Sequence, residues 1–254
     1  MNSSELYGWF LSKVLYDWRP FKKRTKKRFY QKFIKEKDLI LDIGSHMGDR
    51  TDTFLQLGAQ VVAIEPQPIF HNHLLKKYKR QDKVTVIDKA ISNKEGKTQF
   101  HISSKYPTIS TIADQEWVDS IKNATSLNID YNKTIDVDLT TIDKLTEKHG
   151  AFAFVKIDVE GHELEVLQGM TKTTPAVSFE FLSFSFDRLH QCLSYLDDMG
   201  YNSFNWSQGE SFKFNMQDNT ASIQELYDHV VAYDSKKTFG GDVYAWKKRN
   251  QYSN

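Results

Sequence analysis

Short apolar runs alternate with amphipathic stretches over most of the chain, beginning near Asp38. Five runs are too short for buried helices and are bounded by Gly, Asp or Pro, which is typical of buried strands. They read DLILDI, AQVVAI, KVTVI, AFAFVKI and AVSFEF. Helical stretches are expected at residues 49–57, 70–78, 141–149 and 163–168. This alternation predicts strand-helix units around a parallel sheet, and therefore a doubly wound α/β fold.

The C-terminal part supplies two further strand-like runs, YNSFNW and GDVYAW, after a helical stretch at residues 186–199. The main strands then number seven, and a C-terminal hairpin would place antiparallel strands at the edge of the sheet. Two stretches interrupt the rhythm, residues 103–133 and 207–241. The first separates two more short strands, KTQFHI and TIDVDL. Insertions of this size usually carry function or disorder.

The N-terminal part is strongly basic. The chain has 254 residues and a formal charge of +1, yet residues 19–37 hold ten Lys and Arg and one acid, which gives +9 there and −8 elsewhere. Apolar residues at helical spacing, from Phe21 to Ile34, favour a solvated helix that lays an apolar stripe on the domain. A second helical pattern precedes it at residues 6–18. We predict a basic helical cap over residues 1–36 and a main domain over residues 37–254.

Other classes of protein are disfavoured. The single cysteine, Cys192, excludes an intramolecular disulfide and a Cys-rich metal site. No apolar run reaches the roughly 18–20 residues that span a bilayer, and the N-terminus lacks the pattern of a signal peptide. We expect a cytoplasmic protein with no nucleic-acid partner, whose residues 19–37 could contact an anionic membrane or polymer peripherally.

The stretch LILDIGSHMGDRT joins an apolar strand to a helix start through Gly44 and Gly48. Two glycines allow a tight turn and close approach of the backbone to a ligand, at the strand end where ligands bind in such sheets. Ser45 and His46 break the dinucleotide pattern Gly-x-Gly-x-x-Gly, and the Gly-Lys-Ser/Thr phosphate loop is also missing. With the acidic Asp42, this turn suits a cofactor that has an amino-acid end and no phosphate, such as S-adenosylmethionine.

Acids after the next two strands extend this candidate cofactor site. Glu65 follows the second strand, twenty-three residues after Asp42, the distance expected for an acid that accepts from both ribose hydroxyls. Asp88 follows the third strand and could accept from an adenine amino group, although a plain turn acid is an equal alternative. Ala90 would leave room for the adenine ring.

The run LTTIDKLTEKHGAFAFVKIDVEGHELEVLQG resembles the FkbM family of S-adenosylmethionine-dependent methyltransferases. Residues 156–161 and Glu163 are similar to the family signature Lys-Ile-Asp-Val-Glu-Gly-x-Glu, and LILDIGSHMG and VVAIEP add to the likeness over about residues 37–182. The chain departs where the family usually has alanine and asparagine, at Ser45 and His46, and where residues 141–143 read Thr-Ile-Asp instead of Thr-Leu-Asp. The resemblance implies a Rossmann-like class I methyltransferase fold, S-adenosylmethionine as donor and, commonly, O-methylation of a sugar or small metabolite.

Methyl transfer to a hydroxyl needs alignment of the reactants and a base for the hydroxyl proton. Asp158, at the carboxyl end of the fourth strand, is the residue expected nearest the chemistry. His162 titrates near neutrality and precedes the next helix, while Glu180, at the end of the fifth strand, completes an acidic rim. Converging carboxylates suit Mg²⁺, but no metal site is expected, because nothing in the sequence demands one.

Two other functions stay open on the sequence alone. A nicotinamide-dependent oxidoreductase would share the fold class but lacks the glycine pattern. A non-catalytic module could bind anionic surfaces through its basic segment, although an intact Asp42, Gly44, Glu65 and Asp158 argue against loss of the site. The sequence favours an O-methyltransferase for a hydroxyl of a sugar, glycan precursor or related metabolite, and leaves the oligomeric state open.

Overall fold

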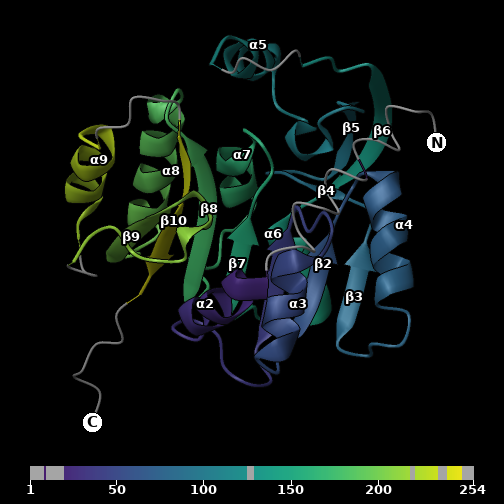
Figure 1. Ribbon diagram of the computed structural model, residues 1–254, viewed down its shortest axis with the longest axis horizontal. Coiled ribbons are helices and arrows are strands. Elements are labelled where there is room, and N and C mark those ends of the chain that lie inside the picture. The colour runs from purple at the N-terminus through teal and green to yellow at the C-terminus, as the bar shows by residue number, and fades with distance from the viewer. Residues whose placement is uncertain (1–8, 10–19, 125–128, 218–220, 234–238, 248–254) are drawn as a thin grey trace.

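The computed structural model describes residue 9 and residues 20–124, 129–217, 221–233 and 239–247 (Figure 1). Its centre is one seven-stranded sheet with the order β3-β2-β1-β7-β8-β10-β9. All neighbours pair in parallel except β10, which runs antiparallel to both β8 and β9. The predicted seven strands and antiparallel C-terminal edge are therefore confirmed. The strands are β1 (Leu39–Ile43), β2 (Gln60–Ile64), β3 (Val84–Ile87), β7 (Phe154–Ile157), β8 (Ala176–Leu182), β9 (Ser203–Gln208) and β10 (Gly240–Trp246).

The register of the central strands places the predicted site residues at one edge. Ile43 of β1 aligns with Ile64 of β2 and with Ile157 of β7, so these three strands end at the same level. The next residue of β7, Asp158, donates its backbone N–H to the Ile43 carbonyl at 3.1 Å. Parallel pairing thus brings the segments that follow β1, β2 and β7 together.

Helices cover both faces of the sheet because alternate strand residues point to opposite sides. One face packs against α6 (Ile142–His149), α7 (Glu163–Gln168), α8 (Phe186–Asp198) and α9 (Ile223–Val231). The other packs against α2 (Pro20–Tyr30) and α3 (Asp49–Gln56), which lie side by side in front of the central strands in Figure 1. The α4 helix (Pro68–Lys77) connects β2 to β3. Each of the helices expected in the main domain is present, with ends shifted by at most two residues.

The described part of the basic segment belongs to the core of the domain. Phe29, Tyr30 and Ile34 are buried and pack with Phe54 of α3 and Phe154 of β7. The expected apolar stripe is therefore present at these residues, and α2 lies on the sheet face against the main body, while the boundary predicted at residue 36 stays a prediction. The first helix expected, at residues 6–18, lies outside the described residues except for Trp9. Among the described residues, the helices are too short or too polar to cross a bilayer.

A second, three-stranded sheet stands beside the main one, with β6 (Lys133–Thr140) between β4 (Ala90–Ile91) and β5 (Gly96–Ile102). The insertion between β5 and β6 folds into η1 (Pro107–Ile109) and α5 (Gln115–Ala124), and the C-terminal one contains η2 (Gly209–Ser211) and α9. The sequence pattern of the two insertions did not indicate these helices. Figure 1 shows α5 beyond the carboxyl ends of the central strands, at the edge where the site residues gather.

Candidate active site

A cavity of about 310 Å³ opens at the carboxyl edge of the main sheet. Its walls come from the segments after β1, β2, β3 and β7, from β4, β5, β8 and β10, from the η1 insertion and from η2. Acidic side chains outnumber basic ones in the lining, so the cavity favours a ligand that carries positive charge. The acids are Asp49, Glu65, Asp158, Glu160, Glu180, Glu210 and Asp242, and the bases are Arg50 and Lys89.

The loop after β1 is shaped by Gly44, which has φ +77°. A Cβ at this position would lie 1.8 Å from the backbone oxygen of Asp158, so only glycine lets the β1 and β7 ends approach this closely. Ser45 is buried and its Oγ donates to the Asp42 carbonyl at 2.7 Å. His46 packs its ring 3.9 Å from the ring of Phe70, and burial lowers the pKa of His46 to about 3. The imidazole is therefore neutral at physiological pH.

Glu65 is an acid of the cavity whose two carboxylate oxygens both accept hydrogen bonds. Its side chain is buried, and one carboxylate oxygen accepts from the backbone N–H of His46 at 2.8 Å while the other accepts from Gln67 at 2.9 Å. Burial raises the pKa of Glu65 to about 7, although both N–H groups act in the opposite direction. Each oxygen keeps acceptor capacity after these bonds, which suits a ligand with two neighbouring hydroxyls.

Three of the predicted cofactor residues are not among those that line the cavity. Asp42 is buried beneath the loop, where it accepts from Thr51 Oγ1 at 2.5 Å, because its strand position points it toward α3. Gly48 forms the turn into α3 with φ +77°. Asp88 lines a separate surface hollow, because the chain leaves the main sheet after β3 and brings Ala90, two residues later, into the cavity. Asp42 and Gly48 thus shape the loop, and Asp88 faces a neighbouring hollow; the predicted cofactor contacts of these three residues stay predictions.

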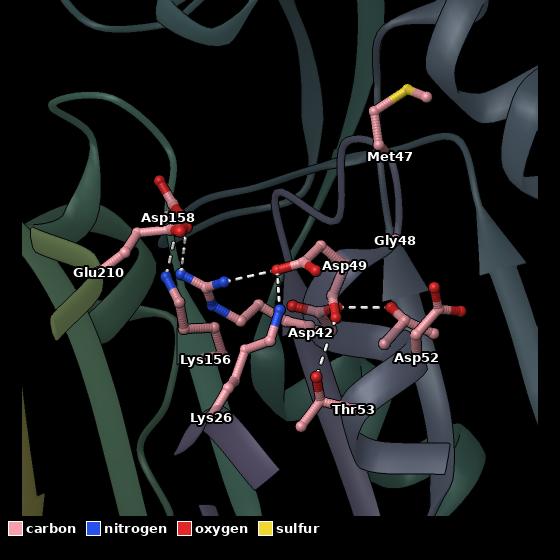
Figure 2. Close-up of polar contacts among 12 residues, drawn as sticks. Lys26, Asp42, Met47, Gly48, Asp49, Asp52, Thr53, Lys156, Asp158 and Glu210 are labelled. Atoms are coloured by element: carbon pink, nitrogen blue, oxygen red, sulfur yellow. Dashed lines mark hydrogen bonds and ion pairs between the residues drawn. The ribbon is translucent and has the colours of Figure 1, made fainter. Parts of the chain in front are cut away.

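Asp158 lines the cavity and contacts a buried lysine beneath it. Lys156 Nζ lies 3.0 Å from Asp158 Oδ2 (Figure 2). It also lies 3.4 Å from Asp242 Oδ1, and the lysine side chain is 1% exposed. Burial alone would lower the pKa of Lys156, but the carboxylates of Asp158 and Asp242 raise it, so the ammonium group stays charged. Burial would likewise raise the pKa of Asp158, but Lys156 and a hydrogen bond from Glu180 hold it below its usual value. Asp158 is thus an ionised carboxylate in the cavity wall.

Glu160 and Glu180 join Asp158 in one acidic corner, where one ligand atom of each lies within 4.8 Å of the others. Burial and the neighbouring Asp158 and Glu163 carboxylates raise the pKa of Glu160 well above its usual value. Burial, Asp158 and Glu160 do the same for Glu180. Asp158 is therefore the member of the corner that holds negative charge most readily. Hard oxygen ligands in this arrangement are of the kind that Mg²⁺ accepts, so the expected absence of a metal stays a prediction.

His162 is not among the residues that line the cavity. Its Nε2 lies 3.0 Å from Ser92 Oγ, and its Nδ1 lies 3.5 Å from Glu165 Oε2 on α7. Burial lowers the pKa of His162. The histidine precedes α7 and turns toward Ser92, which follows β4, and its predicted role as a general base stays a prediction.

The insertion between β5 and β6 closes over the loop that follows Asp158. Thr111 Oγ1 donates to the Glu160 carbonyl at 2.7 Å, and Arg188 of α8 donates to the Gly161 carbonyl at 2.7 Å. Gly161 has φ +97°, and a Cβ there would lie 2.2 Å from the ring of Trp117 on α5. The signature glycine is therefore needed for close packing of α5, which the sequence did not indicate.

Sequence reasoning also missed several residues of the cavity wall. Arg50 and Glu210 form an ion pair at 3.0 Å although 160 positions separate them, and Asp242 contacts Lys156 from β10. Gln67 donates from its side chain to the Pro107 carbonyl at 3.3 Å and joins α4 to the η1 insertion. The sequence could have indicated Arg50, because this cation follows the second glycine by two residues and so lies at the start of the helix beside the loop.

Comparisons with known proteins agree with this geometry. Residues 42–203 match the family model described as the methyltransferase FkbM domain. A search of curated proteins gave no match. Solved structures with a similar fold include a precorrin-6y C5,15-methyltransferase from Geobacter metallireducens, with 11% identity, 88% of this chain and 87% of that chain covered, and a TM-score of 0.47. Another is a putative sarcosine dimethylglycine methyltransferase from Galdieria sulphuraria, with 11% identity, 88% and 86% covered, and a TM-score of 0.46.

These structures are only distantly similar, so the family assignment rests on the family model alone. The matched segment spans more than half of the chain and contains the Gly44 loop, Glu65 and the whole signature around Asp158. The central sheet has the seven strands and the antiparallel edge that this family implies. The chain therefore belongs to the FkbM methyltransferases, which have the class I methyltransferase fold and use S-adenosylmethionine as their cofactor.

Proposed function

We propose that the protein transfers a methyl group from S-adenosylmethionine to a hydroxyl of a sugar, a glycan precursor or a related small metabolite. The observation that carries the proposal is the ionised Asp158 carboxylate in the cavity wall, held by Lys156 and placed against the Gly44 loop. An oxygen nucleophile needs an acceptor for its proton, and a carboxylate beside the reacting atoms supplies one. The cytoplasmic location and the peripheral contact of residues 19–37 with anionic surfaces stay predictions.

The residues of the cavity fit S-adenosylmethionine. Glu65 offers two carboxylate oxygens to a ribose diol, and the space that a Gly44 Cβ would fill is open for backbone approach. Ala90 lines the same cavity, where it leaves room for a ring. Bound there, the cofactor supplies an electrophilic methyl group on a positively charged sulfur, which the acidic lining favours.

The chain's own residues then have separable roles. Glu65 binds the ribose of S-adenosylmethionine. The loop at Gly44 sets how closely the end of β1 approaches Asp158. Asp158 accepts the proton of the acceptor hydroxyl at Oδ, and Lys156 keeps that carboxylate ionised and oriented. Glu180, which hydrogen-bonds to Asp158, helps to orient it. Holding reactants in line contributes several kcal/mol to such a displacement, so positioning matters as much as the base.

The acceptor class is tested by transfer of labelled methyl from S-adenosylmethionine to a panel of sugars, nucleotide sugars and lipid-linked glycans. Each compound is paired with its deoxy analogue, in which the hydroxyl to be methylated is missing. Transfer to a hydroxyl compound and none to its deoxy partner would support O-methylation. Transfer to amines or carbons alone would contradict it. Parallel reactions with EDTA and with added Mg²⁺ show whether the acidic corner needs a cation.

Donor affinity is expected to depend on pH through Glu65. Because the pKa of Glu65 is raised to about 7 by burial, the carboxylate is ionised above that pH and protonated below it. Ribose hydroxyls donate best to the ionised form, so the affinity for S-adenosylhomocysteine should fall as the pH is lowered through about 7. In Glu65→Gln the affinity should be lower by roughly 10- to 100-fold at pH 8. Calorimetry over pH 5.5 to 8.5, roughly ±1.5 units around neutrality, measures both effects.

The same titration of Glu65→Gln serves as the control. The amide cannot ionise, so its affinity should vary less with pH than that of the unsubstituted protein. An equally steep pH dependence in both proteins would show that another group controls donor binding.

A further inference from the structure

Arg50 is a buried cation of the cavity wall to which the proposed reaction gives no role. It lies in the first turn of α3, with its guanidinium over the Phe212 ring at 4.9 Å from the centroid. Nη1 donates to Asp49 at 2.7 Å and Nη2 donates to Glu210 at 3.0 Å. Its side chain is 14% exposed, and its buried Nε has no hydrogen-bond partner. Arg50 lines the cavity, and each of its two Nη atoms carries a second N–H beyond the bonds to Asp49 and Glu210.

The two carboxylates on Arg50 are not equally fixed. Asp49 also contacts the Lys26 ammonium group of α2, as Figure 2 shows, and its side chain is 17% exposed. The Glu210 side chain is 32% exposed and comes from the short η2 turn. Because Glu210 is more exposed than Asp49 and comes from a short turn, it is the carboxylate that a ligand entering the cavity can reach and displace more easily.

The position of this ion pair matches one end of the donor. Glu65 follows β2, while Glu210 follows β9, and the ends of β1 and β7 lie between them in the sheet. Both residues line the same cavity. A ligand whose ribose lies at Glu65 and whose reactive centre lies near Asp158 extends its amino-acid end toward the Arg50 side.

We propose that Arg50 binds the α-carboxylate of the donor's amino-acid end, and that Glu210 occupies this place on the guanidinium until the donor displaces it. The inference rests on the proposed donor site. Guanidinium groups recognise carboxylates through two parallel N–H donors. The exchange replaces one carboxylate with another, so the charge beside Arg50 is conserved and no buried cation is left unpaired.

Two variants separate this role from a structural one. Calorimetry compares S-adenosylhomocysteine with S-adenosyl-3-thiopropylamine, its analogue without the carboxylate, on the unsubstituted protein, Arg50→Gln and Glu210→Gln. Arg50→Gln should weaken binding of S-adenosylhomocysteine by roughly 10- to 100-fold and leave binding of the analogue nearly unchanged. Glu210→Gln should tighten binding of S-adenosylhomocysteine by roughly 3- to 10-fold, because it removes the competing carboxylate. Opposite effects from the two members of one ion pair are not expected of a purely structural contact.

Each other outcome has a defined meaning. Failure of the unsubstituted protein to bind S-adenosylhomocysteine would contradict the proposed function itself. If the unsubstituted protein binds both compounds with equal affinity, Arg50 does not bind the donor carboxylate and the inference is overturned. An equal loss for both compounds in Arg50→Gln would also overturn it, as would weaker binding of S-adenosylhomocysteine in Glu210→Gln. If Arg50→Gln does not fold, the other two proteins still test the inference. The unsubstituted protein should bind S-adenosylhomocysteine more tightly than the analogue, and this preference should increase in Glu210→Gln.

Discussion

Replacing Asp158 with asparagine is expected to lower kcat by roughly 100- to 10,000-fold on an identified acceptor, the range typical of a lost general base. The amide keeps the shape of the side chain but cannot take the hydroxyl proton. Among the three acids of the corner, Asp158 is the expected base because Lys156 holds its pKa below the usual value, whereas burial raises the pKa values of Glu160 and Glu180. Single-turnover transfer of labelled methyl, with calorimetry of S-adenosylhomocysteine on the same sample, separates kcat from donor binding.

The matched control is Asp242→Asn, which removes the other carboxylate on Lys156 and leaves Asp158 in place. It should lower kcat much less than Asp158→Asn, since Lys156 would keep its contact with the base. If Asp158→Asn retains full kcat, or if both variants lose the same activity, Asp158 is not the base. The two aspartates would then act only by holding Lys156 in place.

The second large effect is expected on stability, from Gly44→Ala. At φ +77° an alanine adopts the left-handed region, and its Cβ would lie 1.8 Å from the Asp158 backbone oxygen. The backbone conformation costs about 1–2 kcal/mol and the overpacking about 1–3 kcal/mol more, so the free energy of unfolding should fall by about 2–5 kcal/mol. Donor affinity should fall too, because the β1 and β7 ends are pushed apart. Chemical denaturation measures the first effect and calorimetry the second.

Gly200→Ala is the control for backbone strain alone. Gly200 has φ +83°, but the nearest atom to an added Cβ is the flexible Lys247 Nζ at 3.5 Å. This variant should lose only about 1–2 kcal/mol and bind the donor normally. Similar losses in the two variants would show that the close contact with Asp158 contributes nothing measurable.

The parts of the fold that the sequence predicted well are those encoded locally. Buried strands appear as short apolar runs, and helices such as α7 and α8 appear in the expected places because periodicity within one segment defines them. The Gly44 turn and Glu65 were found because a strand end marks where a ligand can bind. Helices α5 and α9 were missed because they lie in the two insertions, where Trp117 and other apolar residues pack against distant segments.

Where the predicted site residues lie relative to the cavity could not be read from the sequence for the same reason. Asp42 and Asp88 follow or end strands in the sequence, but side-chain direction and the exit of the chain after β3 decide which atoms reach the cavity. His162 follows β7, yet contacts with Ser92 and Glu165 turn it away. The Arg50–Glu210 pair joins residues 160 positions apart, so no local pattern could reveal it.

If the cavity binds S-adenosylmethionine with its ribose on Glu65 and its reactive end beside Asp158, a crystal structure of the protein with S-adenosylhomocysteine will show it. Both ribose hydroxyls are expected within hydrogen-bonding distance of the two Glu65 oxygens, about 2.5–3.0 Å. The sulfur is expected on the Asp158 side of the Gly44 loop. A ligand bound outside the cavity, or a ribose that makes no contact with Glu65, would contradict it.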